Sequence, residues 1–528
     1  MAVVALRPAP RGGGAHTSNS SPSFPSTSSP SGRFPPFLPL LPARSSFSLP
    51  PPLLCRLHRR SAPAPLLPAQ RGPILTAASA AGREPAPALQ PWEANEGGVV
   101  FSAEQIAAAT GGALASPGPA GAVCTDTRAL REGDWFLVLK GANFDGHAFL
   151  QTAADRGCAG AIAEHVPEGW AGGFVKVEDG EAALQALASD VRARFRGPVV
   201  GITGSTGKTT ARTMAALALS SLGRVHETVG NLNNHIGLPL TLLATPSDAA
   251  ACVVELGMSA PGEIDLLQKI CRPTVRVVVN VGPVHLEGCG GTVEGVAACK
   301  AELVAGAGPG DLCVLNGSDP LVSAMAVPAG AARATFGPSG TPGADVWYSA
   351  VEATGPGGLS TRFTLESASG EGESVTISSP GAHLAPNAAV AAVVARAVGV
   401  PLAAAARAME GYVPVGLRMK VEPVGLPAGG TITLLNDCYN SSPASLEAAL
   451  RTLASSAASC GGRPVAVLGD MFELGPATAQ CHLDALIICH ELGINAVAVA
   501  GAAFQAALAA PGAAEPACGL GGVGAMAE

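Results

Sequence analysis

The chain has 528 residues, of which 32 are basic and 40 acidic, giving a net charge of −8, and 48% are hydrophobic. This length has room for about three domains with large cores. Taking the nine arginines of residues 1–83 from the 32 basic residues leaves 23 against 40 acidic ones, a net charge of −17 that argues against a nucleic-acid-binding surface.

Residues 1–83 contain no Lys, Asp or Glu and are rich in Ser, Pro and Arg, a composition typical of organelle transit peptides. The alternative is a Pro/Ser tail without a function. Proline interrupts apolar patches such as "FLPLLP", and no run reaches the roughly 18 residues of a membrane helix. We therefore assign 1–90 to a transit peptide and disordered leader, and expect import into a plastid stroma. Thirteen cysteines without a CxxC pair or zinc-like spacing suit such a reducing interior.

Residues 91–196 alternate short apolar runs, "DWFLVLKG" and "GAIAE", with a helical stretch, "GEAALQALASDVRARF". This alternation predicts a small N-terminal α/β domain.

Residues 197–380 contain "PVVGITGSTGKTT" and three further buried-strand candidates, "ACVVELG", "VRVVVNVG" and "DLCVLNG". Such apolar runs predict a parallel sheet flanked by helices. The segments "VWYSAVEATGPGGLSTRFTLES" and "ESVTISS" alternate as hairpins do.

Residues 381–528 begin with the Ala-rich "APNAAVAAVVARAVG" and then repeat strand and helix in "TITLLND", "PASLEAALRTLASS", "RPVAVLGD" and "INAVAVAG". We expect a second doubly wound, Rossmann-like domain. Nucleotide sites favour the switch points of such sheets and the clefts between domains.

The chemistry begins at a glycine loop between a predicted strand and a predicted helix. Its "GSTGKTT" is one residue shorter than the standard phosphate-binding pattern, and the alternative is an ordinary glycine turn. Lys208 would contact the β and γ phosphates and Thr209 would ligate Mg²⁺. The expected nucleotide-binding residues are Gly204, Ser205, Thr206, Gly207, Lys208, Thr209 and Thr210.

A second Mg²⁺ ligand is expected at a neighbouring strand end. Glu255 follows the apolar run 252–254, which would bring its carboxylate to the same sheet edge. The alternative is an ordinary acidic strand terminus.

Five ordered segments decide the family. They are "GNLNNHIGLPLTLL" (230–243), "ELGMSAPGEI" (255–264), "NVGPVHLEGCGG" (280–291), "DCYNSSPASL" (437–446) and "GDMFELG" (469–475). Together they resemble the Mur ligases, and within that family the member that joins D-alanyl-D-alanine to UDP-N-acetylmuramoyl-tripeptide. The segment "TDTRALREGDWFLVLKGANFDGHAF" (125–149) resembles the uridine-nucleotide domain of that member. The resemblance covers roughly residues 99–505 and implies a three-domain architecture.

The resemblance implies an ATP-dependent ligase that forms an acyl phosphate on a peptide carboxylate, helped by two Mg²⁺ ions. It places Glu255 and His285 at the metals and makes Lys300 the lysine that CO₂ carbamylates to hold the second ion. From the residues alone, His285 could equally be a core histidine and Lys300 a solvated helix lysine.

The resemblance also implies roles for residues on either side of the central domain. Asn387 would meet adenine, and Arg418 would stabilise the transferred phosphoryl group. The remaining positions near the ribose, phosphates or dipeptide are Asp437, Tyr439 and Asn440. The implied substrate-binding positions are Asp126, Thr127, Arg128, Asn231, Asn233 and Asn234, and those of a second uridine motif are Lys140, Asp145, Gly146 and His147.

The chain departs from the family pattern at Cys289 and Gly291, where Phe and Ser are common. It also lacks a late "KGSR"-like strand, so we expect an incomplete C-terminal domain. Two alternatives stay open: another amide ligase, either the third-residue Mur ligase or a folate polyglutamylating enzyme, and an impaired nucleotide-binding scaffold. No "DNPR"-like motif supports the third-residue ligase, and no NKxD motif supports a GTPase. We further expect a monomer without a membrane span.

Overall fold

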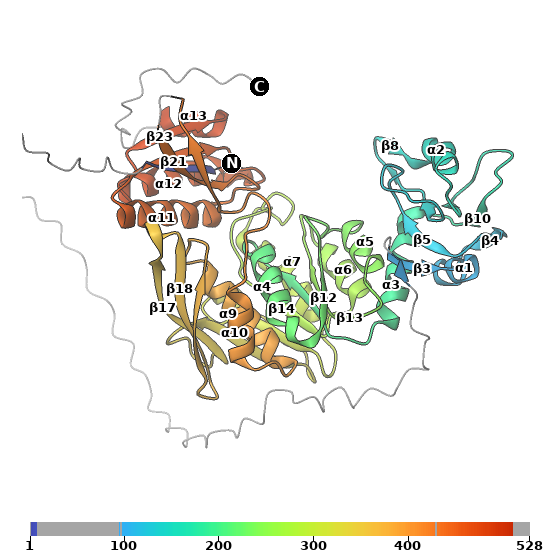
Figure 1. Ribbon diagram of the computed structural model, residues 1–528, viewed down its shortest axis with the longest axis horizontal. Helices are drawn as coiled ribbons and strands as arrows, with labels where there is room; N and C mark the ends of the chain where they lie inside the picture. Colours follow the sequence, from blue (N-terminus) through green and yellow to red (C-terminus); the bar gives the residue numbers. More distant parts are fainter. Residues whose placement is uncertain (1, 8–93, 96–97, 428–429, 510–528) are drawn as a thin grey trace, which may run out of the picture. The chain divides into compact units, whose positions relative to one another are not determined.

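The structure is a computed structural model that describes residues 2–7, 94–95, 98–427 and 430–509. Sheets of seven, nine and five strands organise the N-terminal, central and C-terminal domains of these residues (Figure 1). The predicted transit segment lies outside the described residues, apart from Ala2–Arg7. Within the described ranges no helix has both the length and the apolar character needed to cross a membrane.

The N-terminal domain is a seven-stranded sheet in the order β2-β3-β5-β6-β9-β10-β4. The two apolar runs predicted as strands are β6 and β9, which pair in parallel, and the helical stretch is α3, as expected. The fully buried Trp135 of β6 lies in its core. The elements are β2 (Ala94–Asn95), β3 (Gly98–Phe101), α1 (Ala103–Thr110), β4 (Ala113–Ser116), β5 (Gly121–Cys124), β6 (Trp135–Leu137), β7 (Lys140–Gly141), β8 (Phe144–Asp145), η2 (Gly146–Phe149), α2 (Leu150–Asp155), β9 (Gly160–Ala163), β10 (Gly173–Lys176) and α3 (Gly180–Arg194).

The central sheet has the order β12-β13-β11-β14-β15-β16-β17-β18-β19 and is parallel as far as β17. The strands β17, β18 and β19 continue it as antiparallel hairpins, as their alternation predicted. Its strands are β11 (Val199–Thr203), β12 (Arg224–Glu227), β13 (Ala249–Glu255), β14 (Val275–Val278), β15 (Leu312–Asn316), β16 (Ala332–Pro338), β17 (Val346–Thr354), β18 (Ser360–Ser367) and β19 (Gly372–Ile377).

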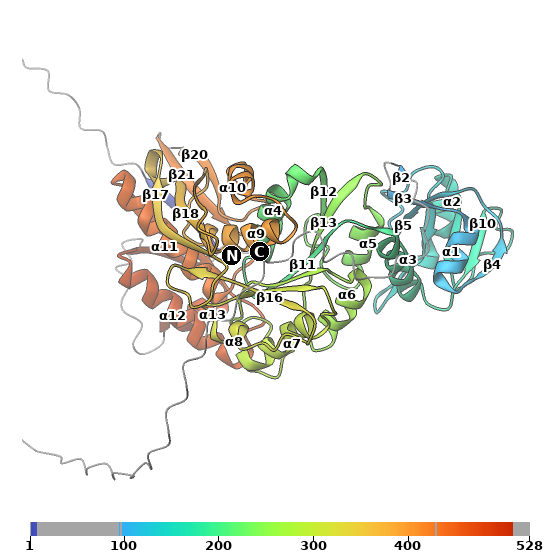
Figure 2. The ribbon, with the colours of Figure 1, turned by 90° about the horizontal axis from the view of Figure 1, so that it is seen from below.

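Helices cover both faces of the central sheet (Figure 2). One apolar core joins α4, α9 and α10 to the sheet, and the other joins α5, α6 and α7 to it together with α3 of the N-terminal domain. The helices are α4 (Lys208–Ala218), α5 (Gly237–Leu243), α6 (Glu263–Cys271), α7 (Val293–Ala305), α8 (Pro320–Ser323), α9 (Leu384–Ala397) and α10 (Leu402–Met409).

The Ala-rich helix α9 corrects the domain boundary that the sequence predicted at residue 380. Its side chains from Val390 to Ala395 are buried in the core of the central sheet, and it packs against α4. A helix that is apolar on all sides must be buried, but its sequence does not say against which sheet. The central domain therefore extends through α10, about 30 residues beyond the predicted boundary.

The C-terminal sheet has the order β20-β21-β1-β22-β23. Its middle strand is β1, which pairs antiparallel with both β21 and β22, although the sequence analysis placed these residues in the leader. An extended segment can enter because two neighbouring strands offer it free N–H and C=O groups. The elements are β1 (Ala2–Arg7), β20 (Lys420–Gly425), β21 (Thr431–Asp437), α11 (Pro443–Cys460), β22 (Arg463–Gly469), α12 (Thr478–Glu491), β23 (Ala496–Ala500) and α13 (Ala502–Ala509).

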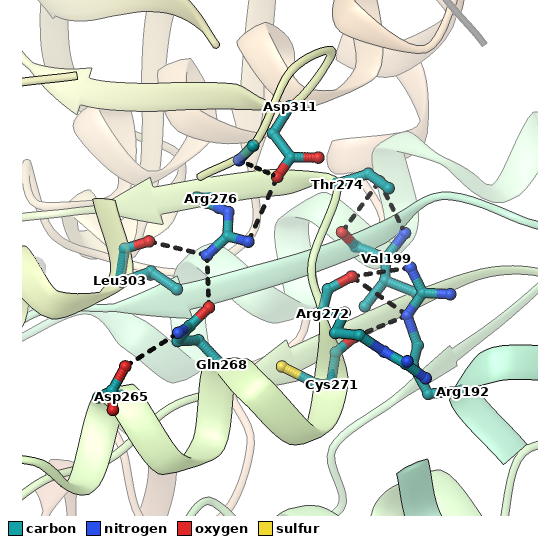
Figure 3. Close-up of polar contacts among 11 residues, drawn as sticks. Arg192, Val199, Asp265, Gln268, Cys271, Arg272, Thr274, Arg276, Leu303 and Asp311 are labelled. Atoms are coloured by element: carbon teal, nitrogen blue, oxygen red, sulfur yellow. Dashed lines mark hydrogen bonds and ion pairs between the residues drawn. The ribbon is translucent and has the colours of Figure 1, made fainter. Parts of the chain in front are cut away.

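Two buried arginines hold helices in place: one ties α7 to the central sheet, and the other ties α3 to the end of α6 (Figure 3). Arg276 of β14 donates to the Leu303 carbonyl of α7 at 2.9 Å and lies 3.3 Å from the Asp311 carboxylate. Arg192 of α3 donates at 2.7 Å to each of the carbonyls of Cys271 and Arg272, where α6 ends. These bonds satisfy carbonyls that helix ends leave unpaired; they hold α7 against β14 and α3 against the end of α6.

Candidate active site

A cavity of about 880 Å³ is lined by the loop before α4, the ends of neighbouring central strands and the start of the C-terminal domain. Many of the residues predicted for the site from the sequence lie on its wall. They are Ser205, Thr206, Gly207, Lys208, Thr209, Thr210, Asn231, Asn233, Asn234, Glu255, His285, Asn387, Arg418, Asp437, Tyr439 and Asn440.

Asn280, which follows β14, fixes the conformation of the glycine loop. The backbone N–H of Thr206 donates to Asn280 Oδ1 at 2.9 Å, and Asn280 Nδ2 donates to the Thr206 carbonyl at 3.1 Å. Gly207 has φ +79°, and a Cβ there would lie 2.8 Å from Asn387 Oδ1. The loop therefore needs glycine, and it presents backbone N–H groups and the start of α4 to one space, as an anion site requires.

Lys208, the first residue of α4, lies within this loop. Its Nζ donates to the Gly204 carbonyl at 2.7 Å. Burial lowers the pKa of Lys208, Glu255 opposes this, and Arg418 adds to it. The Lys208 ammonium group is thus partly desolvated, and its electrostatic attraction to an anionic ligand is stronger than it would be in water.

Glu255 ends β13 beside the glycine loop, as predicted, and is only 2% exposed. Its Oε1 lies 3.2 Å from the guanidinium of Arg212, which is also 2.9 Å from Glu227 Oε2. Sequence reasoning missed Arg212, although a charged residue four positions after Lys208, on the same face of a mainly apolar helix, was a usable signal.

The oxygen donors around Glu255 suit Mg²⁺. Within the described residues, Glu255 Oε1 is buried and is paired with Arg212 but accepts no hydrogen bond, and Thr209 is 6% exposed at the start of α4. Carboxylate and hydroxyl oxygens are the protein ligands that this hard cation takes beside a nucleotide. The donor set therefore fits the ion that the sequence predicted.

His285 joins the central domain to the C-terminal domain. Its Nδ1 contacts Glu473 Oε2, and the backbone N–H of Leu286 donates to the Glu473 carbonyl at 3.2 Å. Both His285 and Glu473 have positive φ, +53° and +61°. The core-histidine reading is therefore wrong, because His285 lies on the cavity wall. The role of Glu473 was missed, although its segment "GDMFELG" was among the family signals.

Lys300 lies on α7 and is only 1% exposed, so it is not a solvated helix lysine. Burial, and then the charge of Lys208, lower the pKa of Lys300 to about 7. Lys300 is not part of the cavity lining, and neither is Gly204. Cys289, one of the departures from the family pattern, packs beside the same helix, 3.5 Å from the Sγ of Cys299.

The C-terminal domain contributes the opposite wall. The Arg418 guanidinium lies 4.2 Å from the centre of the Tyr439 ring. Asp437 Oδ1 accepts the Met419 N–H at 3.0 Å, and burial raises the pKa of Asp437. Asn387 of α9, in the central domain, also lines the cavity; it donates to the His383 carbonyl at 2.7 Å and leaves its buried Oδ1 without a hydrogen-bond partner in the described chain. An amide oxygen placed so could accept from the amino group of a base.

The asparagine loop before α5 also lines the cavity. Asn234 Oδ1 accepts the N–H of Gly237, the first residue of α5, at 2.8 Å. The Asn233 carbonyl accepts the Gly257 N–H at 2.8 Å, which ties the loop to the segment after β13. These bonds position the loop, with Asn231 at its exposed side.

The predicted uridine-nucleotide residues lie in the N-terminal domain and do not line the cavity. Arg128 forms an exposed ion pair with Asp126, at 2.7 Å, and Thr127 lies between them. This pairing lowers the pKa of Asp126 to about 2. The second motif forms the β7–β8 hairpin and the turn η2 that follows it.

Two family models match the chain: the Mur ligase middle domain over residues 202–395, and the Mur ligase glutamate ligase domain over residues 418–517. The UDP-N-acetylmuramoyl-tripeptide–D-alanyl-D-alanine ligase of Bacillus subtilis is 35% identical over 366 residues, which cover 69% of this chain and 76% of the relative. The chain belongs to the Mur ligase family. The enzyme of the same name from Escherichia coli is 34% identical, over 75% of this Mur ligase and 84% of its own length.

Solved structures agree with this assignment. MurF from Acinetobacter baumannii superposes with a TM-score of 0.69 at 30% identity, over 79% of this Mur ligase and 88% of that chain. MurF from Thermotoga maritima in complex with ADP gives a TM-score of 0.62 at 28% identity, over 73% and 86% of the two chains. The predicted α/β Mur ligase architecture is confirmed, and this Mur ligase is an ATP-dependent amide ligase.

Proposed function

We propose that this Mur ligase joins D-alanyl-D-alanine to the tripeptide of UDP-N-acetylmuramoyl-tripeptide, in peptidoglycan precursor synthesis. The names of the curated relatives support this substrate pair. The observation that carries the proposal is the meeting of three features around one cavity: the phosphate loop with Lys208, the buried Glu255, and the asparagine loop 231–234. The phosphate loop and Glu255 have the groups that would bind ATP and its Mg²⁺, and the asparagine loop lines the same cavity.

In the first step a carboxylate oxygen of the tripeptide would attack the γ-phosphorus of ATP. The bond to the β-phosphate bridging oxygen breaks, ADP leaves, and an acyl phosphate forms. Backbone N–H groups of 204–208 and the Lys208 ammonium would hold the β and γ phosphates. Asn387 Oδ1 would accept from the adenine amino group, and Arg418 would stabilise the charge on the transferred group.

In the second step the free amine of D-alanyl-D-alanine would attack the acyl carbon. An amide bond forms, inorganic phosphate leaves, and the amine loses a proton. Mg²⁺ held by Thr209, Glu255 and His285, and by a carbamate on Lys300, would supply charge neutralisation when bound. With a pKa near 7, Lys300 has a substantial neutral fraction at neutral pH, and only a neutral amine reacts with CO₂.

The test is a phosphate-release assay with ATP, UDP-N-acetylmuramoyl-tripeptide and D-alanyl-D-alanine. We expect release to require both acceptor and dipeptide, and mass spectrometry to show the pentapeptide product. Replacing D-alanyl-D-alanine with single amino acids, or the nucleotide with a folate, tests the other amide ligases. Nucleotide binding without any turnover would instead support an impaired scaffold and refute the proposal.

We further propose that the protein acts in a plastid and as a monomer. The arginine-, serine- and proline-rich composition of residues 1–83 supports the location. Size-exclusion chromatography with light scattering would test the oligomeric state.

A further inference from the structure

Three potential metal ligands gather in the N-terminal domain, outside the cavity. His147 lies in η2, whereas Glu164 and His165 directly follow β9. One ligand atom from each lies within 4.8 Å of the others. The hairpin motif and the loop after β9 thus meet at a group whose side chains could bind one cation.

His147 is oriented as a metal-binding histidine is. Its Nδ1 lies 2.6 Å from Asp145 Oδ1, which also accepts the His147 backbone N–H at 3.0 Å. A proton on Nδ1 directed at this carboxylate leaves the lone pair on Nε2. The side chain is 10% exposed, and within the described residues Nε2 is buried without a hydrogen-bond partner. A carboxylate on the far nitrogen is the usual support of a ligating imidazole.

Glu164 and His165 complete the ligand set. The His165 ring stacks on the His147 ring, with centroids 4.0 Å apart and planes 6° apart. Glu164 adds a carboxylate, and Asp145 a second negative charge behind His147. The set has two imidazoles, one carboxylate and an excess of negative charge.

We propose that His147, Glu164 and His165 bind a divalent cation of the zinc class. Two imidazoles and a carboxylate are ligands for Zn²⁺, Co²⁺ or Ni²⁺, whereas Mg²⁺ and Ca²⁺ take oxygen ligands. Bonds of 2.0–2.2 Å in a tetrahedral site place ligand atoms about 3.3 Å apart. The exposed His165 can rotate to close that gap. Water would take the fourth position.

The ion would link the turn after the β7–β8 hairpin, through His147, to the loop after β9, through Glu164 and His165. This hairpin is exposed, with Phe144 at 52%, and each of its strands has two residues. A three-ligand ion that joins segments 17 residues apart would restrain it more than its short ladder can. Metal binding should therefore slow proteolysis of residues 140–147. This protection does not depend on the amide-bond-forming reaction, so its test is independent of the proposed function.

The test uses the full chain, with excess Mg²⁺ and a non-hydrolysable ATP analogue present to fill the central site. Co²⁺ is added and its visible absorption followed, and Zn²⁺ competition then gives the zinc affinity. The variants are His165→Ala and Glu164→Gln. His490→Ala, an exposed histidine on α12, is the matched control. Circular dichroism melts without added metal show whether each variant is folded.

We expect one Co²⁺ per chain, without a thiolate charge-transfer band. Its affinity should fall about tenfold or more in His165→Ala and Glu164→Gln, and stay unchanged in His490→Ala. Zn²⁺ should protect the hairpin from trypsin in the parent and not in His165→Ala. Equal Co²⁺ affinity in all four proteins would overturn the proposal. So would loss of UDP binding in His165→Ala with unchanged Co²⁺ affinity, which would assign the histidines to the nucleotide instead.

Discussion

The guanidinium of Arg212 lies 3.2 Å from the carboxylate of Glu255, and both side chains are almost completely buried. Arg212 also holds Glu227 at 2.9 Å, so one cation balances two carboxylates beneath the glycine loop. Burial raises the pKa of Glu227, and Arg212 acts against that shift. The predicted Mg²⁺ ligand is therefore positioned by a residue of the same helix that begins at Lys208.

Arg212→Met should lower the free energy of unfolding by about 3 kcal/mol, because it leaves the buried Glu255 carboxylate, and the partly buried Glu227 carboxylate, without their cation. Arg224→Met is the control. It breaks an ion pair with Asp248 whose side chains are 60% and 68% exposed, and should cost no more than about 1 kcal/mol. Urea unfolding without nucleotide measures both. Equal losses in the two variants would show that the buried cluster adds nothing to stability.

Lys208→Ala should keep the fold and lower the turnover number by roughly 10²–10³-fold, since it removes the cation beside the β and γ phosphates. Lys269→Ala, on the exposed side of α6, should retain parental activity. The measurement is phosphate release at saturating substrates. If Lys208→Ala stays within a few-fold of the parent, the assignment of the phosphate loop is wrong.

Lys300→Ala should lose most of the ligation rate, because no carbamate can form to hold the second Mg²⁺. Alanine suits the helix α7, so the fold should persist. Acetate or formate, added at constant ionic strength, should restore part of the rate by filling the vacated space. Lys208→Ala should show no such rescue. A near-parental rate without any additive would refute a role for Lys300 in the reaction.

The burial of Lys300 also predicts a pH-dependent stability. Its pKa falls from 10.5 to about 7 in the fold, so below pH 7 the folded state carries a buried ammonium at full cost. Between pH 7 and 10.5 folding releases the proton, and stability rises with pH. Without CO₂, Lys300→Met should thus be more stable than the parent at pH 6.

The expected advantage of Lys300→Met is a few kcal/mol, on the order of 1.4 kcal/mol per pKa unit, and it should shrink from pH 7 toward pH 10.5. Urea unfolding at pH 6, 8 and 10 measures it. Lys269→Met, at an exposed position, should change stability by no more than about 0.5 kcal/mol at each pH. An advantage that does not vary with pH would reflect packing rather than charge.

A reporter fused to residues 1–83 should enter plastids and lose this segment, as the composition predicts, and in the full chain the same cleavage would remove strand β1 from the C-terminal sheet. Fluorescence microscopy and N-terminal sequencing of the imported protein give the location and the cleavage site. The same fusion with the nine arginines changed to glutamine should stay in the cytosol. Cytosolic retention of the unchanged fusion would contradict the plastid assignment.

Local features of the site were predictable from the sequence because they depend on neighbouring residues. A strand, a loop that needs glycine at 207 and a helix from Lys208 follow from hydrophobic periodicity and from the backbone conformation that glycine permits. Glu255 was found because parallel strands that run together end at the same sheet edge. The order of the segments that resemble the Mur ligases predicted the family.

Contacts between distant segments were decided only by the tertiary structure. Helix α9 is apolar on every side, so its sequence required burial but could not choose between two sheets. The pairing of Arg212 with Glu255, and of His285 with Glu473, joins residues 43 and 188 positions apart. No local pattern encodes such distances.

The sequence by itself thus determined the family, the nucleotide loop and the order of strands and helices, since these depend on local propensity and on motifs of adjacent residues. The tertiary structure determined which side chains are buried away from solvent. In the sequence, Lys300 cannot be told from an exposed helix lysine, yet its burial lowers its pKa to about 7. His147 and His165 are 18 residues apart in the chain and stack only because β9 ends beside the hairpin. Burial and proximity are properties of the packed chain, and they set the charge and reactivity of these groups.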